Sequence, residues 1–192
     1  MNVPLSKSKV SPAQLAHIAF RTNRLKEMVS WYRTVLAARS NFATEQVELL
    51  SYDDEHHRVA FLALSKYAAR PTDETVGFYH SAFAYRSLGE LLGNYLRLRD
   101  AGILPQRCIN HGGTTSMYYA DPDGNQVELQ VDAFSTSADV NRFLQSKEFA
   151  SNPIGIEFDP NELIARYEAG APERELLLRS DLNPAEFSQV GA

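Results

Sequence analysis

The sequence predicts an α+β fold made of tandem βαβββ modules that close around a cavity, followed by a C-terminal helical extension. The first observation behind this prediction is an internal repeat, because a shift of 63 residues places His17 on His80 and Tyr32 on Tyr95. The second is that each copy begins with a short alternating segment and continues with an amphipathic helical pattern. The third is that residues 133–192 have no counterpart in the repeat.

The repeat also sets the expected boundaries. We expect an N-terminal tail at residues 1–12, modules at about 13–66 and 76–132, and the helical extension at 133–192. In each module the helix covers one face of its sheet and leaves the other face free. Two such half-open sheets can close on each other around a cavity.

Composition limits the classes of partner. The chain of 192 residues carries 24 acidic and 19 basic residues, and its Lys and Arg are scattered, so we expect no nucleic-acid binding. The longest apolar run, at residues 59–64, is far shorter than the about 20 residues of a membrane-spanning helix, so no membrane span is expected. No apolar stretch follows Lys7 and Lys9, and the single Cys108 cannot form an internal disulfide. These features favour a cytoplasmic protein.

The first module begins with the alternating residues 15–20, which predict a strand. Asn23 is then a candidate N-cap for a helix over 25–36, whose apolar side chains recur at the spacing of one helix face. Residues 47–52 and 57–64 predict two further strands joined by a polar turn, and a meander of about three strands fits the available length.

The second module repeats this order. A strand is expected over 78–85, and the following helix starts with the capping box Ser87-x-x-Glu90, in which each side chain can satisfy a free backbone amide. The remaining strands are predicted at 108–111, 115–119 and 126–131, and the helices of the extension at 137–145, 160–170 and 172–182.

Strand alternation places polar side chains on the free faces of the two sheets. His17 and His80 occupy equivalent positions of the repeat, and Glu128 alternates with Val127 and Leu129 in the last strand. Two imidazoles and one carboxylate on one face of a metal ion leave other positions open, which is the arrangement of non-haem Fe(II) oxygenases. Either histidine alone could equally be a hydrogen-bonded core residue. Their recurrence, together with a carboxylate in an apolar strand, favours a metal site.

Two sequence features resemble the vicinal oxygen chelate superfamily, which has the glyoxalase/bleomycin resistance/dioxygenase fold. One is the His-x-Ala-Phe sequence at the start of each copy, and the other is the segment Tyr-Tyr-Ala-Asp-Pro-Asp-Gly-Asn-Gln-Val-Glu-Leu at 118–129. Within the superfamily the chain resembles the type I extradiol ring-cleavage dioxygenases, specifically the one-domain enzymes resembling biphenyl-2,3-diol 1,2-dioxygenase. The resemblance covers about residues 13–132.

The resemblance implies catalytic roles for three further residues. His57, in the segment Glu-His-His-Arg-Val-Ala-Phe, matches the cavity acid/base of the family, and His56 is a structural neighbour. His111 resembles a histidine that hydrogen-bonds the substrate or oxygen, and Tyr118, ten residues before Glu128, resembles a tyrosine that contacts the ring hydroxyl. Their alternative interpretations are a solvated turn, a polar residue of a glycine loop and a plain core position.

The number of ligands distinguishes this branch from glyoxalase-like relatives, which use four protein ligands. Aligning the ends of the two copies sets Ala60 at the position of Glu128, so a methyl group stands where the fourth ligand would be. The resemblance therefore implies Fe(II) as cofactor, with His17, His80 and Glu128 as its ligands. Mn(II) can be held by the same nitrogen and oxygen donors.

The expected reaction is the extradiol cleavage of a small aromatic diol of the catechol type by O2. Phe61, Leu62 and Phe83 indicate an apolar pocket for such a ring. We also expect a homo-oligomer, since related small members associate. Two alternatives stay open, namely a non-catalytic small-molecule binder of the bleomycin-resistance kind and a glyoxalase-like metal-dependent isomerase or lyase.

Overall fold

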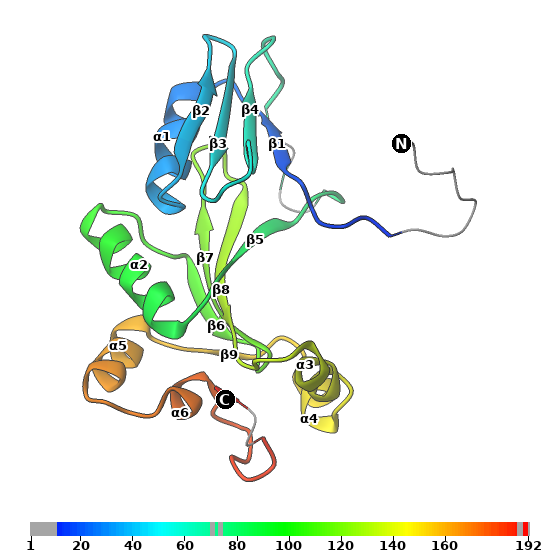
Figure 1. The fold of residues 1–192 in the computed structure, drawn as a ribbon, viewed down its shortest axis with the longest axis vertical. Helices are drawn as coiled ribbons and strands as arrows, with labels where there is room; N and C mark the ends of the chain where they lie inside the picture. Colours follow the sequence, from blue (N-terminus) through cyan, green and yellow to red (C-terminus); the bar gives the residue numbers. More distant parts are fainter. Residues whose placement is uncertain (1–10, 70–71, 73–74, 188–189, 192) are drawn as a thin grey trace, which may run out of the picture. The chain divides into compact units, whose positions relative to one another are not determined.

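The computed structural model describes residues 11–69, 72, 75–187 and 190–191, so the expected tail at 1–12 lies almost entirely outside the described residues. The chain forms two compact units, residues 1–68 and 69–192, and each is described by itself (Figure 1). Each unit contains a strand, a helix and three further strands in that order, which confirms the predicted α+β fold with tandem βαβββ modules.

The first unit is a four-stranded sheet covered by one helix. Its strands have the order β1-β4-β3-β2, with β1 and β4 parallel and the other neighbours antiparallel. The elements are β1 (Ile18–Arg21), α1 (Leu25–Val35), β2 (Arg39–Ala43), β3 (Val47–Ser51) and β4 (Val59–Leu62).

Helix α1 packs its apolar side on this sheet. Met28, Tyr32 and Val35 are fully buried, and the Tyr32 ring lies 5.0 Å from the ring of Phe61 on β4. Phe61 also stacks on Phe20 of β1. Phe61 is therefore a core residue under the helix, so of the three apolar residues considered for a pocket it is one that does not lie on the free face. The cause is the register, because Phe61 pairs with Phe20, which faces the helix.

The predicted cap of α1 is wrong. The N-cap is Arg24, which makes no side-chain cap hydrogen bond. The Asn23 side chain instead donates to the carbonyl of Tyr67 at 3.0 Å and accepts from the Tyr67 amide at 2.9 Å. The Asn23 side chain therefore binds a distant segment and does not cap the helix.

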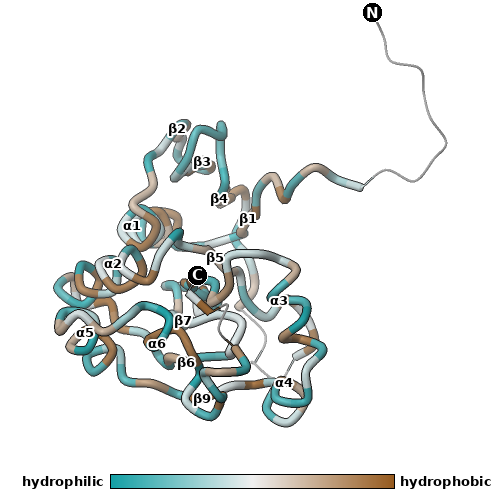
Figure 2. The backbone as a smooth tube through the Cα atoms, turned by 60° about the horizontal axis from the view of Figure 1, so that its bottom comes forward, coloured by the Kyte–Doolittle hydropathy of each residue, from teal (hydrophilic) through white to brown (hydrophobic). Residues whose placement is uncertain are grey.

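The second unit is a five-stranded sheet of order β5-β8-β7-β6-β9, in which β5 and β8 are parallel. The middle of β7 and β8 is almost entirely buried. The module elements are β5 (His80–Tyr85), α2 (Leu88–Asp100), β6 (Arg107–Asn110), β7 (Thr114–Ala120) and β8 (Gln126–Asp132). Hydrophobic and hydrophilic stretches, brown and teal in Figure 2, alternate along helices α1 and α2, as expected of amphipathic helices.

Half of the expected capping box of α2 is formed, since the hydroxyl of the N-cap residue Ser87 accepts from the Glu90 amide at 3.2 Å. The Glu90 carboxylate accepts at 3.0 Å from the Arg86 amide, one residue before the N-cap, rather than from the Ser87 amide. Phe83 of β5 pairs with Leu129, which is buried and alternates with Glu128. Phe83 therefore points to the side opposite Glu128 and does not lie on the free face either.

The C-terminal extension contains two elements that the sequence did not predict. These are helix α4 and strand β9, which pairs with β6 and widens the second sheet. The last helix is shorter than expected and ends at Leu177 rather than residue 182. The elements of the extension are α3 (Ser137–Leu144), α4 (Lys147–Ser151), β9 (Ile156–Glu157), α5 (Pro160–Glu168) and α6 (Glu173–Leu177).

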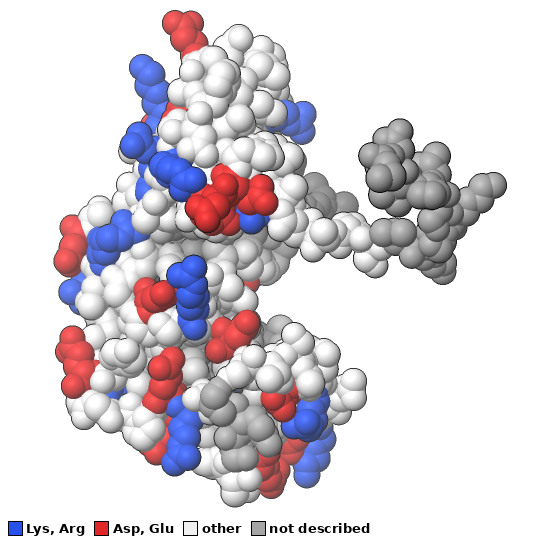
Figure 3. Space-filling view, in the orientation of Figure 1, with Lys and Arg blue, Asp and Glu red and all other residues white. Residues whose placement is uncertain are grey.

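The extension is joined to the module by polar contacts. The carboxylate of Glu173 accepts from the Leu88 amide at 3.0 Å and so supplies a further cap for α2. Acidic and basic side chains are interspersed on the face drawn in Figure 3. None of the helices in the described residues is long and apolar enough to cross a lipid bilayer.

Candidate functional site

Four of the predicted site residues meet in the second unit. His80 Nε2 lies 2.9 Å from Glu128 Oε2, and the Tyr118 hydroxyl lies 3.1 Å from Glu128 Oε1. His111 Nε2 is 2.8 Å from the same Tyr118 hydroxyl. These side chains come from β5, β8, β7 and the loop after β6, so residues far apart in the chain form one connected group.

The sheet register explains this convergence. Tyr118 and Glu128 are direct cross-strand partners of β7 and β8, so their side chains lie on the same face. His80 pairs with Gln126 across the parallel β5–β8 ladder, and Gln126 shares the face of Glu128 because it is two residues away. Alternation in three neighbouring strands is therefore sufficient to bring the imidazole, the phenol and the carboxylate together.

Because it is buried, the carboxylate of Glu128 requires hydrogen-bond or ion-pair partners. The residue is only 5% exposed, and a buried charge is unfavourable unless hydrogen-bonded or paired. His80 contacts one carboxylate oxygen and Tyr118 the other. Burial raises the pKa of Tyr118 far above its ordinary value, and the charge of Glu128 and its hydrogen bond raise it further, so Tyr118 stays a phenol at neutral pH.

Arg107 belongs to this group, and the sequence analysis missed it. Its guanidinium lies 4.4 Å from the centre of the Tyr118 ring, donates to the Tyr79 hydroxyl at 2.8 Å and lies 3.3 Å from Gln126 Oε1. The Arg107 charge opposes the rise in the Tyr118 pKa. Its position directly opposite Tyr118 on β6 is the signal that strand pairing would have provided.

The other two predicted residues, His17 and His57, meet in the first unit. Their ring centres are 4.4 Å apart, and His17 precedes β1 while His57 lies two residues before β4. The strand predicted from His57 therefore begins later than expected, at Val59. Arg58 holds the two segments together, since it donates to the carbonyls of Leu15 and Ala16 at 3.1 and 3.2 Å.

His56 lies against His57, with their Nδ1 atoms 2.5 Å apart. Partial burial lowers the pKa of His57 below its ordinary value, and the charges of His17 and His56 lower it further, whereas Glu55 acts in the opposite direction. His57 is therefore a neutral base at pH 7. The folded protein binds this proton less readily than the unfolded chain, so the stability contributed by neutral His57 is lost as the pH falls below about 6.5.

The donors in the second unit suit a divalent metal ion. A nitrogen and an oxygen 2.9 Å apart, as in His80 and Glu128, have the separation expected for neighbouring ligands at right angles with metal bonds of roughly 2.0–2.2 Å. His80 Nδ1 is buried, so Nε2 is the nitrogen directed to the free face. Among the described residues, no group of three His, Cys, Asp or Glu side chains converges.

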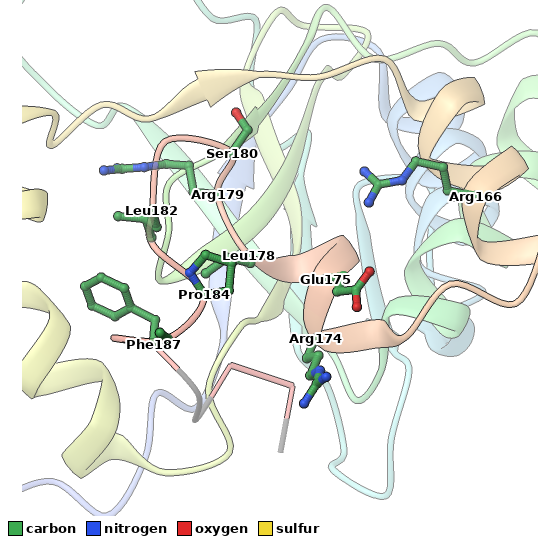
Figure 4. A pocket seen from close by; sticks show the side chains of 10 residues that line it. Arg166, Arg174, Glu175, Leu178, Arg179, Ser180, Leu182, Pro184 and Phe187 are labelled. Atoms are coloured by element: carbon green, nitrogen blue, oxygen red, sulfur yellow. The ribbon is translucent and has the colours of Figure 1, made fainter.

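The register also supports the expected absence of a fourth ligand. Ala60 pairs with Ala19 in the first unit, and Glu128 pairs with Ala82 in the second. Since Ala19 and Ala82 are equivalent in the repeat, Ala60 occupies the position of Glu128, as the alignment predicted. A cavity of about 660 Å³ in the extension is lined by none of the predicted site residues (Figure 4).

Comparisons with known proteins find a matching family profile and similar sequences. A profile of the Glyoxalase/Bleomycin resistance protein/Dioxygenase superfamily matches residues 14–129. Biphenyl-2,3-diol 1,2-dioxygenase 3 of Rhodococcus globerulus is 43% identical over 168 residues, which cover 87% of this chain and 88% of the relative. Biphenyl-2,3-diol 1,2-dioxygenase 2 of the same organism is 39% identical over 159 residues, which cover 83% and 84%.

Solved structures share the fold. A glyoxalase/dioxygenase from Nostoc punctiforme superimposes with a TM-score of 0.52 at 16% identity, covering 66% of this chain and 98% of that protein. At this identity the likeness concerns the fold alone.

The electrostatics around His57 can be tested in the metal-free protein by NMR titration of its ring. We expect a midpoint below about 6.5. His56→Gln should move the midpoint up because a neighbouring positive charge is lost, and Glu55→Gln should move it further down. Identical midpoints in the two variants would contradict this explanation.

Proposed function

Because the chain belongs to the Glyoxalase/Bleomycin resistance protein/Dioxygenase superfamily and is an extradiol dioxygenase within it, we propose that it uses Fe(II) and O2 to cleave a catechol-type diol. Biphenyl-2,3-diol is the first substrate to consider, since both dioxygenase relatives carry its name. The observation that supports the proposal most is the buried Glu128 carboxylate, which has the His80 imidazole on one oxygen and the Tyr118 phenol on the other.

His17, His80 and Glu128 are the proposed ligands. Two neutral imidazoles and one carboxylate suit Fe(II), and Mn(II) accepts the same donors. When bound, the metal ion lowers the pKa of the diol hydroxyls and gives the diol and O2 a common point of attachment. The methyl group of Ala60 in place of a fourth ligand agrees with the need for open positions.

The remaining residues transfer protons and orient the substrate. His57 is neutral at pH 7 because its pKa is lowered, so it accepts a proton from a diol hydroxyl. Tyr118 keeps its proton and orients the substrate hydroxyl by a hydrogen bond. His111, which contacts Tyr118, accepts the proton of the second diol hydroxyl, and His57 and His111 would return these protons to the oxygen atoms taken from O2. The ring carbon–carbon bond beside the diol breaks, and both atoms of O2 enter the ring-opened product.

The activity can be tested by anaerobic reconstitution with Fe(II), followed by oxygen-electrode and visible-absorbance assays over diols from catechol to biphenyl-2,3-diol. We expect equimolar consumption of O2 and diol and the absorbance of a conjugated ring-opened product. Iron retention without any O2 uptake over the panel would overturn the proposal in favour of an isomerase or lyase. Failure to retain iron would favour a non-catalytic binder.

Removal of the carboxylate tests the proposed metal site. Glu128→Ala should reduce the iron retained per chain to a tenth or less, since even changes next to metal ligands cost about 10–100-fold in affinity. Iron content after gel filtration gives the measurement. Gln130→Ala is the matched control, because Gln130 lies on the same strand face two residues away and should leave iron content unchanged. Full iron retention by Glu128→Ala would refute the ligand assignment.

His57→Ala separates proton transfer from metal binding. We expect unchanged iron content and a turnover number lower by about 10²–10⁴-fold, the usual contribution of a positioned acid or base. Turnover and iron content are measured on the same preparation. A turnover number equal to that of the wild type would exclude His57 as the acid/base.

A further inference from the structure

The loop that carries His111 is held by a fully buried arginine of the C-terminal extension. Arg179 is 0% exposed, and its Nη1 donates to the carbonyls of His111 at 3.2 Å and Asn152 at 2.8 Å. Nη2 donates to the carbonyl of Glu148 at 3.2 Å, and Nε to the carboxylate of Asp181 at 2.7 Å. One guanidinium therefore joins the loop after β6 to helix α4 and its C-cap, and also binds Asp181 of its own segment.

The direction of the Arg179 side chain agrees with its contacts to these segments. Although Arg179 contributes to the lining of the cavity in the extension, its guanidinium points away from Arg166 and Arg174, which line the same cavity (Figure 4). Its donors are used for backbone carbonyls and Asp181. Only arginine offers five donors in a planar fork, so lysine could not reproduce the whole set of bonds.

A tight turn beside Arg179 contacts the His111 ring directly. The carbonyl of Ile154 lies 2.5 Å from His111 Nδ1. The Asn152 side chain closes this turn, since it accepts from the Gly155 amide at 2.9 Å and donates to the Gly155 carbonyl at 3.1 Å. Gly155 has φ +102°, and a Cβ there would lie 2.3 Å from the Asn110 carbonyl oxygen, so the close approach requires glycine.

The contact with Ile154 determines the tautomer of His111. A carbonyl oxygen only accepts hydrogen bonds, so Nδ1 must carry the proton. In the neutral ring, Nε2 is then the basic nitrogen, and it is the atom that faces the Tyr118 hydroxyl at 2.8 Å. The nitrogen available for proton exchange is thus directed to the cluster of Tyr118 and Glu128.

We propose that Arg179 and the Asn152–Gly155 turn are the positioning elements of His111, which fix its ring orientation and its Nδ1-protonated tautomer, so that Nε2 is free to take up a proton and pass it on to the reacting group. The inference rests on the proposed role of His111 in the dioxygenase reaction. A buried cation gives no general gain in stability over apolar packing, whereas it does fix the geometry of the segments it binds. The extension would then be a part of the active site that acts through His111.

The tautomer can be measured by NMR of the metal-free protein labelled with 15N-histidine, with the His111 signals identified by their absence in His111→Asn. In the wild type we expect a proton on Nδ1 of His111. Arg179→Met should give a mixture of tautomers, and Arg142→Met, which changes an exposed arginine of α3, should give the wild-type spectrum. Asn152→Ala, which opens the turn but leaves Arg179 in place, decides the question if Arg179→Met does not fold.

Kinetics of the iron-loaded protein provide the second measurement. Arg179→Met and Asn152→Ala should lower kcat about 10–100-fold at unchanged iron content and unchanged KM for the diol, and Arg179→Lys should recover part of the loss. An unprotonated Nδ1 in the wild type, or wild-type ring signals in both Arg179→Met and Asn152→Ala, would overturn the proposal. The absence of O2 uptake by the wild type would overturn the dioxygenase function instead, and the NMR result would still decide the tautomer.

Discussion

The buried carboxylate of Glu128 is the constraint on which the second unit depends. An ionised side chain at 5% exposure is tolerated only with partners, and here each oxygen has one, the His80 imidazole and the Tyr118 hydroxyl. Both partners follow from strand register, so the polar group is fixed by the same ladder that buries Val127 and Leu129 on the opposite face. A shift of one residue in β8 would place the carboxylate under helix α2 and an apolar side chain in the site.

The hydrogen bonds continue from Glu128 through Tyr118 and His111 to the carbonyl of Ile154. This series of hydrogen bonds has three contacts, and an acceptor oxygen stands at each end. All three contacts can therefore be hydrogen bonds only when three protons are present. Tyr118 and a neutral His111 supply two of them. This series of hydrogen bonds therefore has room for one more proton than its neutral members carry, which is the property needed of a group that takes up a proton and returns it during a reaction.

The sequence could predict this face because alternation and the repeat are local or periodic signals. The equivalence of His17 with His80, and of Ala60 with Glu128, requires only the alignment of two copies. What it could not predict depends on contacts between distant segments. Asn23 has the residue type and position of a cap, but the Tyr67 backbone that binds it is 44 residues away. Arg179 escapes prediction for the same reason, since its carbonyl partners lie 27 to 68 residues away in the chain and no helical or strand pattern marks the residue.

The two copies share a scaffold but differ in the side chains at equivalent positions. The second copy has a histidine on its first strand and a carboxylate on its last, whereas the first has a histidine and, at Ala60, a methyl group. A fourth ligand would fill a position that diol and O2 need, so oxygen chemistry favours the loss of one carboxylate. The first copy nevertheless carries another reactive side chain. His57 lies in the turn before β4, and its lowered pKa makes it a base at neutral pH. On the proposed assignment of His17, His80, Glu128 and His57, the first copy contributes one ligand and a proton acceptor, and the second copy contributes two ligands and a hydrogen-bonded phenol.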